Sequence, residues 1–296
     1  MRIKILCIAG PTASGKSSRA VEEALKGFVN LSSNEGFTKP FMGEIISVDS
    51  RQVYRGLDIG TEKITVEEMR GVPHHLIDIL EANETYSAGN FVADAARLIE
   101  EISARGKLPI LVGGTHFYFD ALLFGLPTGV DANPALREEL EKLETEELFA
   151  RVRGADARRA DELDPQNRRR LIRALEIIDS LGAIPPRLVN TPSFGTRLNL
   201  VLEWIVIDPS REELRTRIEV RLQSALDRGL INEVRRVRGE VGDARLNELG
   251  LEYKIVGEFL RNERTEESLL PTLSAKLWQY ARRQKAWLRK LGHPMS

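Results

Sequence analysis

Residues 3–17 decide the fold: they read Ile-Lys-Ile-Leu-Cys-Ile-Ala-Gly-Pro-Thr-Ala-Ser-Gly-Lys-Ser. The apolar run 3–9 has the length of a buried strand, and residues 18–25 have the pattern of a helix. Between them, Gly10 to Ser17 match the phosphate-binding pattern G-x-x-x-x-G-K-S, the P-loop. A strand, a glycine loop and a helix in this order predict a site for a diphosphate or polyphosphate. They do not indicate which one it is or which bond breaks.

The residue types of this loop suit an anion. Its two glycines let the backbone curl so that several N–H groups point inward, and the helix N-terminus adds a partial positive charge. Lys16 supplies a full charge, and the hydroxyl of Ser17 is placed to bind Mg²⁺, which we expect as the cofactor. The predicted diphosphate-binding residues of the loop are Gly10, Pro11, Thr12, Ala13, Ser14, Gly15, Lys16 and Ser17.

Composition sets the broad class. The chain has 296 residues, of which 42% are hydrophobic and 29% charged, as in soluble globular proteins of about two domains. A net charge of −1 predicts neither a nucleic-acid nor a membrane partner, so any such partner requires a local patch. Cys7 is the only cysteine, which excludes an internal disulfide and fits a reducing compartment. With no signal peptide and no membrane span in the sequence, we expect a cytoplasmic protein.

Further apolar runs predict a parallel sheet. The run ending at Asp49 is expected to be a second buried strand, and ligands of such sheets sit at the carboxyl ends of strands. Asp49 should therefore emerge near the P-loop. The fold class is α/β, with helices flanking the sheet. Strands are expected at 44–50, 74–79, 108–115 and 200–208, helices at 90–105, 116–124, 211–228, 231–238, 247–260 and 266–290, and a surface loop at 28–43.

The character of the chain changes between residues 127 and 199. Apolar strands disappear, and short amphipathic helices alternate with charged turns. We predict an all-helical insertion domain at 127–199 inside a catalytic core formed by 1–126 and 200–296. The expected helices of the insertion are 134–143, 146–153, 155–163 and 167–181.

Seven blocks, taken together and in order, resemble the tRNA dimethylallyltransferase (tRNA isopentenyltransferase) family of bacterial type. The resemblance covers nearly the whole chain. One departure is that the family's usual Gly-Tyr-Lys/Arg reads here Gly-Leu-Glu-Tyr-Lys at 250–254, which puts a tRNA role of that turn in doubt. The blocks are 10–17, 48–54 with 58–61, 74–78, 86–88, 111–115, 169–176 and 280–289.

The resemblance implies transfer of a dimethylallyl group from its diphosphate to N6 of an adenosine beside the tRNA anticodon. Lys16, the loop N–H groups and Mg²⁺ on Ser17 would stabilise the departing diphosphate. Asp49 is the candidate general base for the weakly nucleophilic amine. By position alone Asp49 is equally a Mg²⁺ ligand of Walker B type, and the resemblance favours the base. Thr115 would orient the adenine or Asp49; the alternative is a plain N-cap of the next helix.

An arginine is also expected at the diphosphate. Either Arg217 or Arg221 resembles the family's contact, and the two share a helix face because they lie four residues apart. The alternative for each is a surface ion pair with Glu213 or Glu219.

A tRNA partner implies a flipped-out base and contacts to phosphates. Several segments match family segments that touch the anticodon loop of tRNA, although a charge run is by default a solvated face. We expect the protein to be a monomer. The matching residues are Asp49, Ser50, Arg51, Gln52, Thr115, Arg137, Arg169, Arg170, Leu171, Ile172 and Arg173.

Three other functions remain open on the residues alone. A small-molecule kinase would use the P-loop on ATP and Asp49 on a hydroxyl, but it needs no arginine-bearing insertion. A transferase acting on free adenylate would not need the insertion either. A nucleic-acid-binding switch protein would bind a nucleotide without transfer chemistry, and the missing second Walker B strand speaks against it.

Overall fold

The computed structural model describes residues 2–26, 43–125, 130, 132–184 and 199–291. Most of the loop expected at 28–43 lies outside these residues. The chain divides into two compact units, one of Met1–Leu123 with Phe194–Ser296 and one of Phe124–Ser193. Each unit is described by itself.

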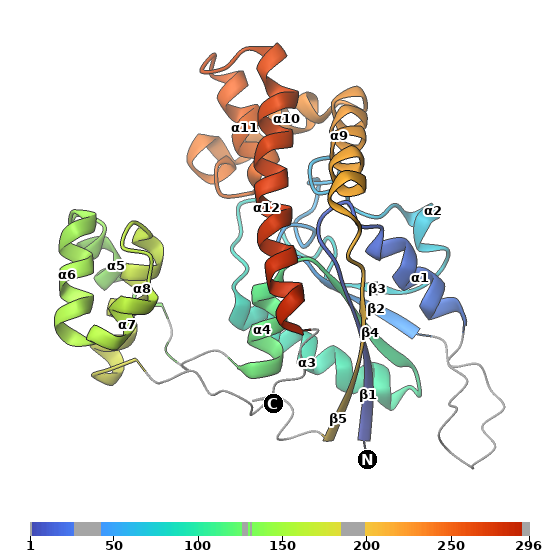
Figure 1. Cartoon of the computed structure of the whole chain (residues 1–296), viewed down its shortest axis with the longest axis horizontal. Helices are drawn as coiled ribbons and strands as arrows, with labels where there is room; N and C mark the ends of the chain where they lie inside the picture. The colour runs from blue at the N-terminus through green and yellow to red at the C-terminus, as the bar shows by residue number, and fades with distance from the viewer. Residues whose placement is uncertain (1, 27–42, 126–129, 131, 185–198, 292–296) are drawn as a thin grey trace. The chain divides into compact units, whose positions relative to one another are not determined.

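The first unit is built on a five-stranded sheet with the order β3-β2-β4-β1-β5, in which all neighbours are parallel (Figure 1). Ala9 lies opposite both Gly113 and Val206, and Gly113 lies opposite Val48. The carboxyl ends of four strands therefore meet at one edge, which gathers the loops that follow them. The strands are β1 (Arg2–Ala9), β2 (Gly43–Val48), β3 (His74–His75), β4 (Leu108–Gly113) and β5 (Asn199–Val206).

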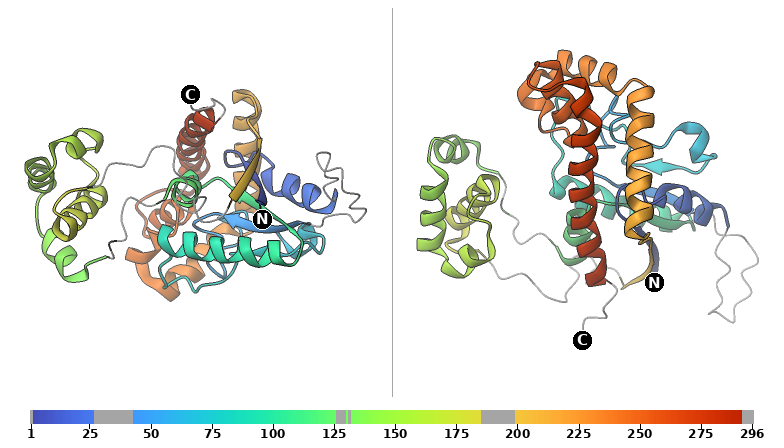
Figure 2. Two further views of the ribbon diagram at one scale, coloured as in Figure 1. Left: turned by 90° about the horizontal axis from the view of Figure 1, so that it is seen from below. Right: turned by 45° about the horizontal axis from the view of Figure 1, so that its top comes forward.

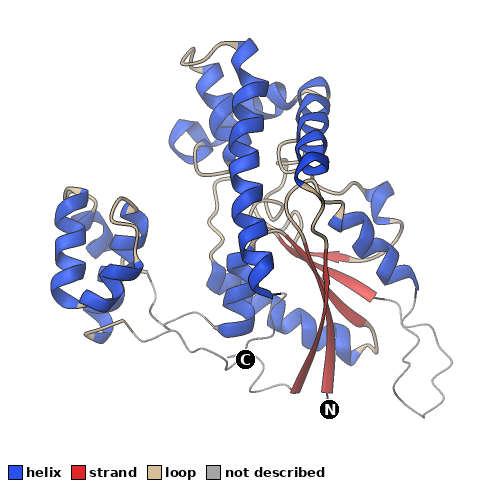
Figure 3. Ribbon diagram, in the orientation of Figure 1, coloured by secondary structure: helices blue, strands red, loops and turns tan. Residues whose placement is uncertain are grey.

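Helices cover both faces of the sheet (Figure 3). Successive side chains of β1 point to opposite faces, so Leu6 and Ile8 pack on α1 (Lys16–Lys26), while Cys7 packs with α3 (Ala88–Ala104) and α4 (His116–Phe124). A strand that is buried on both faces needs a continuous apolar run, which is why the buried residues 5–9 show no alternation.

The C-terminal helices form a second core with residues 53–57, and α9 lies beside α12 in both views of Figure 2. Several boundaries differ from the prediction, among them that of the strand expected at 74–79, which ends at His75. The helix expected at 231–238 continues to Leu246, with Gly242 outside helical dihedrals, and the next helix begins only after Gly250. The helices are α9 (Arg211–Asp227), α10 (Leu230–Leu246), α11 (Leu251–Leu260), the short 3₁₀ turn η1 (Glu266–Ser268) and α12 (Leu269–Leu291).

A short helix was not predicted: α2 (Val66–Met69). Thr65 and Glu68 form its capping box, a local signal that the sequence carries in plain view. None of the described helices is both long and apolar enough to cross a bilayer.

The described residues of the second unit form a bundle of four helices. Asn133, Asp156 and Asn167 cap three of them by accepting a backbone N–H, as expected for residues that compete with helical bonding elsewhere. Its apolar core includes Leu148, Val152 and the buried face of the last helix. The helices are α5 (Pro134–Leu140), α6 (Thr145–Ala155), α7 (Ala157–Glu162) and α8 (Arg168–Leu181).

Candidate active site

A cavity of about 490 Å³ opens in the first unit at the carboxyl edge of the sheet. The P-loop, the turns after β2 and β4, and the helices α9, α11 and α12 all contribute to its walls. Lys16, Asp49, Thr115, Arg221 and Glu252 line this one cavity. The edge that parallel topology makes available to a ligand is therefore the edge at which the titratable groups gather.

The P-loop has the conformation that its sequence predicts. Ala13 and Gly15 adopt left-handed dihedrals, with φ of 60° and 83°, and α1 begins directly afterwards at Lys16. A Cβ on Gly10 would lie 2.5 Å from Ser14 Oγ and 3.0 Å from the carbonyl oxygen of Ile207, so a larger residue where β1 enters the turn would force its neighbours to move. Ser14 Oγ is itself buried and has no hydrogen-bond partner among the described residues. An anion in the loop would give it one.

Lys16 is the cation of the loop. Its ammonium donates to the carbonyl of Pro11 at 3.3 Å. Removal from solvent lowers the pKa of Lys16 to about 8, an effect that Asp49 opposes and Arg221 reinforces. A polyanion bound beside it would raise this pKa again, so binding and protonation of Lys16 are coupled.

Asp49 follows β2 and is held by the backbone. Its Oδ1 accepts hydrogen bonds from the N–H groups of Arg51 at 2.8 Å and of Gln52 at 3.3 Å. Thr115 Oγ1 accepts from the N–H of Ser50 at 3.3 Å and also bonds the hydroxyl of Tyr280. The turn after β4 and the middle of α12 thus fix the turn that carries Asp49. Thr115 directly precedes α4, lines the cavity and, through its side chain, bonds the turn at Ser50.

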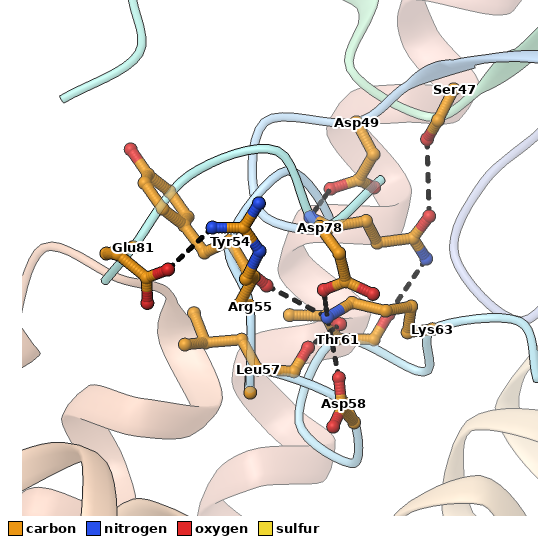
Figure 4. A network of polar contacts seen from close by, with 12 residues as sticks. Ser47, Asp49, Tyr54, Arg55, Leu57, Asp58, Thr61, Lys63, Asp78 and Glu81 are labelled. Carbon is orange, nitrogen blue, oxygen red and sulfur yellow. Dashed lines mark hydrogen bonds and ion pairs between the residues drawn. The ribbon is translucent and has the colours of Figure 1, made fainter. Parts of the chain in front are cut away.

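A network of hydrogen bonds supports the part of the cavity wall that is formed by the loop at 54–63 (Figure 4). The side chain of Gln52 accepts from Ser47 Oγ at 3.3 Å and donates to the carbonyls of Thr61 and Glu62 at 3.3 and 3.2 Å. It therefore ties the end of β2 to the loop at 54–63.

The buried side chain of Lys63 stabilises the same loop (Figure 4). Its ammonium donates to the carbonyl of Tyr54 at 2.8 Å and to the carboxylates of Asp58 and Asp78 at 2.6 and 2.5 Å. Its side chain is only 5% exposed, so these three acceptors replace the water that the charge has lost.

The two candidate arginines are separated by the structure. Arg221 lines the cavity and donates to Thr12 Oγ1. Arg217 is not among the lining residues: it donates to the carbonyl of Ser14 at 3.0 Å and pairs with Glu213 at 2.6 Å. Arg217 therefore makes the ion pair that was its alternative, while Arg221 faces the space that an anion would occupy.

Two residues of the site received no role from the sequence. Gln284 accepts from the N–H of Thr12 at 2.9 Å and donates to the carbonyl of Gly114 at 2.8 Å, joining the P-loop to the turn after β4. Gln284 and Thr12 are 272 residues apart, so no local pattern links them. One sequence signal could have identified Gln284: it is a polar residue at the helical spacing of the otherwise apolar, buried face of α12. Glu252 is the other, and it pairs with Arg221.

The predicted tRNA-contacting residues of the second unit divide into two groups. Arg137 holds both oxygens of Glu176, at 2.7 and 3.0 Å, and Arg173 adds a third contact at 3.2 Å. Glu176 has a fully buried side chain; burial opposes its ionisation, yet Arg137, the N–H of Asn133 and Arg173 hold its pKa below the ordinary value. Arg137 and Arg173 therefore stabilise the helical unit by pairing with a buried carboxylate.

The second group consists of the other four predicted residues, all on α8: Arg169, Arg170, Leu171 and Ile172. Leu171 and Ile172 are buried in the core of the helical unit, so their side chains are not available to a partner. Arg169 and Arg170 are exposed. Of the matched segment 169–173, these two present their charges most fully to solvent.

Comparison with known proteins decides the family. A family model described as IPP transferase matches residues 52–291. The chain belongs to the IPP transferase family. Its relatives include the tRNA dimethylallyltransferases of Pediococcus pentosaceus, 39% identical over 97% of this chain and 88% of the relative, and of Thermomicrobium roseum, 39% identical over 98% and 84%.

Solved structures of the IPP transferase family agree. The full-length tRNA isopentenylpyrophosphate transferase of Bacillus halodurans aligns with a TM-score of 0.67 and 36% identity, over 97% of this chain and 87% of that one. A eukaryotic dimethylallyltransferase acting on tRNA aligns with a TM-score of 0.77 and 28% identity, over 96% and 69%. The resemblance stated from the motifs and the predicted P-loop-type α/β fold are both confirmed.

Proposed function

We propose that this protein transfers a dimethylallyl group from dimethylallyl diphosphate to N6 of an adenosine next to the anticodon of tRNA and releases diphosphate. The observation that carries the proposal is the single cavity shared by the P-loop and Asp49. The names of its relatives supply the substrate class.

Asp49 acts on the incoming amine. The lone pair of the adenine amine is delocalised into the ring, so the amine attacks C1 of the allyl chain poorly unless a base accepts its proton. Asp49 takes this proton as the new N–C bond forms, and positioned base catalysis contributes about 10²–10⁴-fold. Its two backbone hydrogen bonds, together with the anchoring of Ser50 by Thr115, fix its direction.

The P-loop acts on the leaving group. When the C1–O bond breaks, its electron pair remains on the bridging oxygen of the diphosphate. Lys16, the N–H groups at the start of α1 and Arg221 stabilise that charge as it develops. Thr12 and Ser14 add hydroxyls, and Ser14 Oγ, which has no partner among the residues that the structure describes, suits this role.

Mg²⁺ fits this donor set. Magnesium bound with a diphosphate takes most ligands from phosphate oxygens and water and few from protein. Ser17, in the first turn of α1 at the cavity wall, offers one hydroxyl, and the described residues contain no cluster of three or more His, Cys, Asp or Glu that would hold a metal alone. The ion would neutralise part of the charge on the departing diphosphate.

Each unit contains residues that we propose to contact the tRNA. Ser50, Arg51 and Gln52 line the cavity that receives the flipped base, and Arg169 and Arg170 of the helical insertion would contact phosphates. We further propose that the enzyme is a monomer. We also propose that it acts in the cytoplasm, in keeping with its one, buried cysteine. Contact of Arg137 and Arg173 with tRNA is a further proposal, which the resemblance to the family implies and which the partial exposure of both side chains allows.

The test uses labelled dimethylallyl diphosphate with unmodified tRNA, followed by mass analysis of the nucleosides. We expect prenylated adenosine and free diphosphate in equal amounts. Parallel reactions contain free adenylate, or ATP with a small alcohol. Alkylation of free adenylate at the rate seen with tRNA, or ATP consumption without alkylation, would contradict the proposal.

A further inference from the structure

One wall of the cavity carries a second buried carboxylate. Glu252 is in the first turn of α11, and its side chain is 12% exposed. It lies within the turn at 250–254, where the sequence departs from the family's usual Gly-Tyr-Lys/Arg. Its Oε1 is 3.6 Å from Nη2 of Arg221, the arginine that faces the P-loop.

The surroundings of Glu252 determine how strongly its charge would act on an anion bound in the cavity. Arg221 is also approached by Glu62 at 3.3 Å, but Glu62 is 41% exposed and shares its charge with Arg228 at 2.9 Å. Water screens an exposed carboxylate and screens a buried one far less. Burial raises the pKa of Glu252, and Arg221 opposes that rise. In its ionised form, which Arg221 favours and burial opposes, Glu252 is therefore the less screened of the two carboxylates beside Arg221.

Glu252 also fills a place that would attract an anion. Leu249, Gly250 and Leu251 line the cavity, so α11 begins at its wall. The start of a helix favours negative charge, and here the protein supplies that charge itself. A diphosphate is thereby directed to the remaining anion site, the P-loop at the start of α1.

We propose that Glu252 tunes the affinity of the cavity for diphosphate, weakening its hold on the released product. This inference rests on the proposed function, because it assumes that diphosphate occupies the P-loop. The substrate is also held by burial of its prenyl group, and its ester oxygen carries no charge. Free diphosphate loses the apolar contact and gains charge at that oxygen, so repulsion from Glu252 acts more strongly on the product than on the substrate.

The opposite effect is a clear alternative. If Glu252 served chiefly to hold Arg221 in place, its removal would weaken diphosphate binding. The 3.6 Å separation is longer than a hydrogen bond, whereas the guanidinium is already anchored on Thr12 Oγ1. We therefore expect the charge of Glu252 to dominate over its positioning effect.

The experiment is a calorimetric titration of the full chain with inorganic diphosphate and Mg²⁺ at neutral pH. We expect Glu252→Gln to bind diphosphate on the order of tenfold more tightly than wild type, since one unscreened charge is removed near a multivalent anion. Product inhibition by diphosphate should strengthen equally. The matched control is Glu240→Gln, an exposed carboxylate paired with Arg236 outside the cavity, which should bind as wild type does.

The outcomes separate the two proposals. If wild type binds diphosphate and Glu252→Gln binds it equally or more weakly, the inference is overturned and the proposed function stands. If wild type itself fails to bind diphosphate, the proposed function fails. Glu252→Ala replaces the glutamine variant should that one not fold, and it must show the same tightening.

Discussion

Raising the pH from 7 to 9 should weaken the enzyme's capture of dimethylallyl diphosphate through Lys16. With a pKa of about 8 in the ligand-free protein, Lys16 is charged below that pH and neutral above it. Its charged fraction falls from about nine tenths at pH 7 to about one tenth at pH 9, so kcat/KM for dimethylallyl diphosphate should fall about tenfold. The substrate diphosphate is ionised throughout this range and adds no break of its own.

The assay measures kcat/KM for dimethylallyl diphosphate at saturating tRNA across this range. Lys16→Arg is the control, because arginine keeps its charge: its activity should be lower, but the break near pH 8 should vanish. Arg221→Ala should move the break upward, since Arg221 helps to lower the pKa of Lys16. A wild-type profile that stays flat to pH 9, or an unchanged break in Lys16→Arg, would refute this reasoning.

Four further variants test other parts of the account. Gln284→Ala leaves the buried N–H of Thr12 without its acceptor and should lower the free energy of unfolding by about 1–3 kcal/mol in urea titrations, whereas an unchanged midpoint would contradict the bridge. Glu176→Ala should destabilise the helical unit by about 2–4 kcal/mol, seen as faster proteolysis; because its pKa is held low, wild type keeps this stability at neutral pH and loses it as pH falls through that pKa. Arg169→Ala and Arg170→Ala should each raise KM for tRNA several-fold and lower the salt slope by about 1, with KM for dimethylallyl diphosphate unchanged; a flat response to both would exclude phosphate contacts there.

The strand, loop and helix around Lys16 were predictable because their signals are local. Apolar run, glycine loop and helix follow one another without a gap, and the parallel sheet order confirms what those runs indicate. Asp49 was placed beside the P-loop by a single topological rule, that ligands lie at strand carboxyl ends. Asp49 and the P-loop line the same cavity. Their placement could be predicted without knowing any particular side-chain contact between them.

The contacts that complete the site were not predictable. Arg217 and Arg221 share a helix face, and only the position of the P-loop relative to α9 shows which one lines the cavity. Gln284 reaches the loop from the far end of the chain, a distance that no periodicity covers. For Leu171 and Ile172 the sequence pointed to a contact that the fold does not offer. Both belong to a segment that matches the family in sequence, but the helical period of α8 turns their side chains into the core.

The most direct test of the central claim is the single-turnover rate of Asp49→Asn with tRNA and dimethylallyl diphosphate both bound. If Asp49 prepares the amine while the P-loop holds the diphosphate, prenyl transfer should slow by about 10²–10⁴-fold while diphosphate affinity stays within a few-fold of wild type. Transfer at nearly the wild-type rate would contradict the account. So would a loss that follows entirely from weaker diphosphate binding, because Asp49 would then serve the leaving group instead.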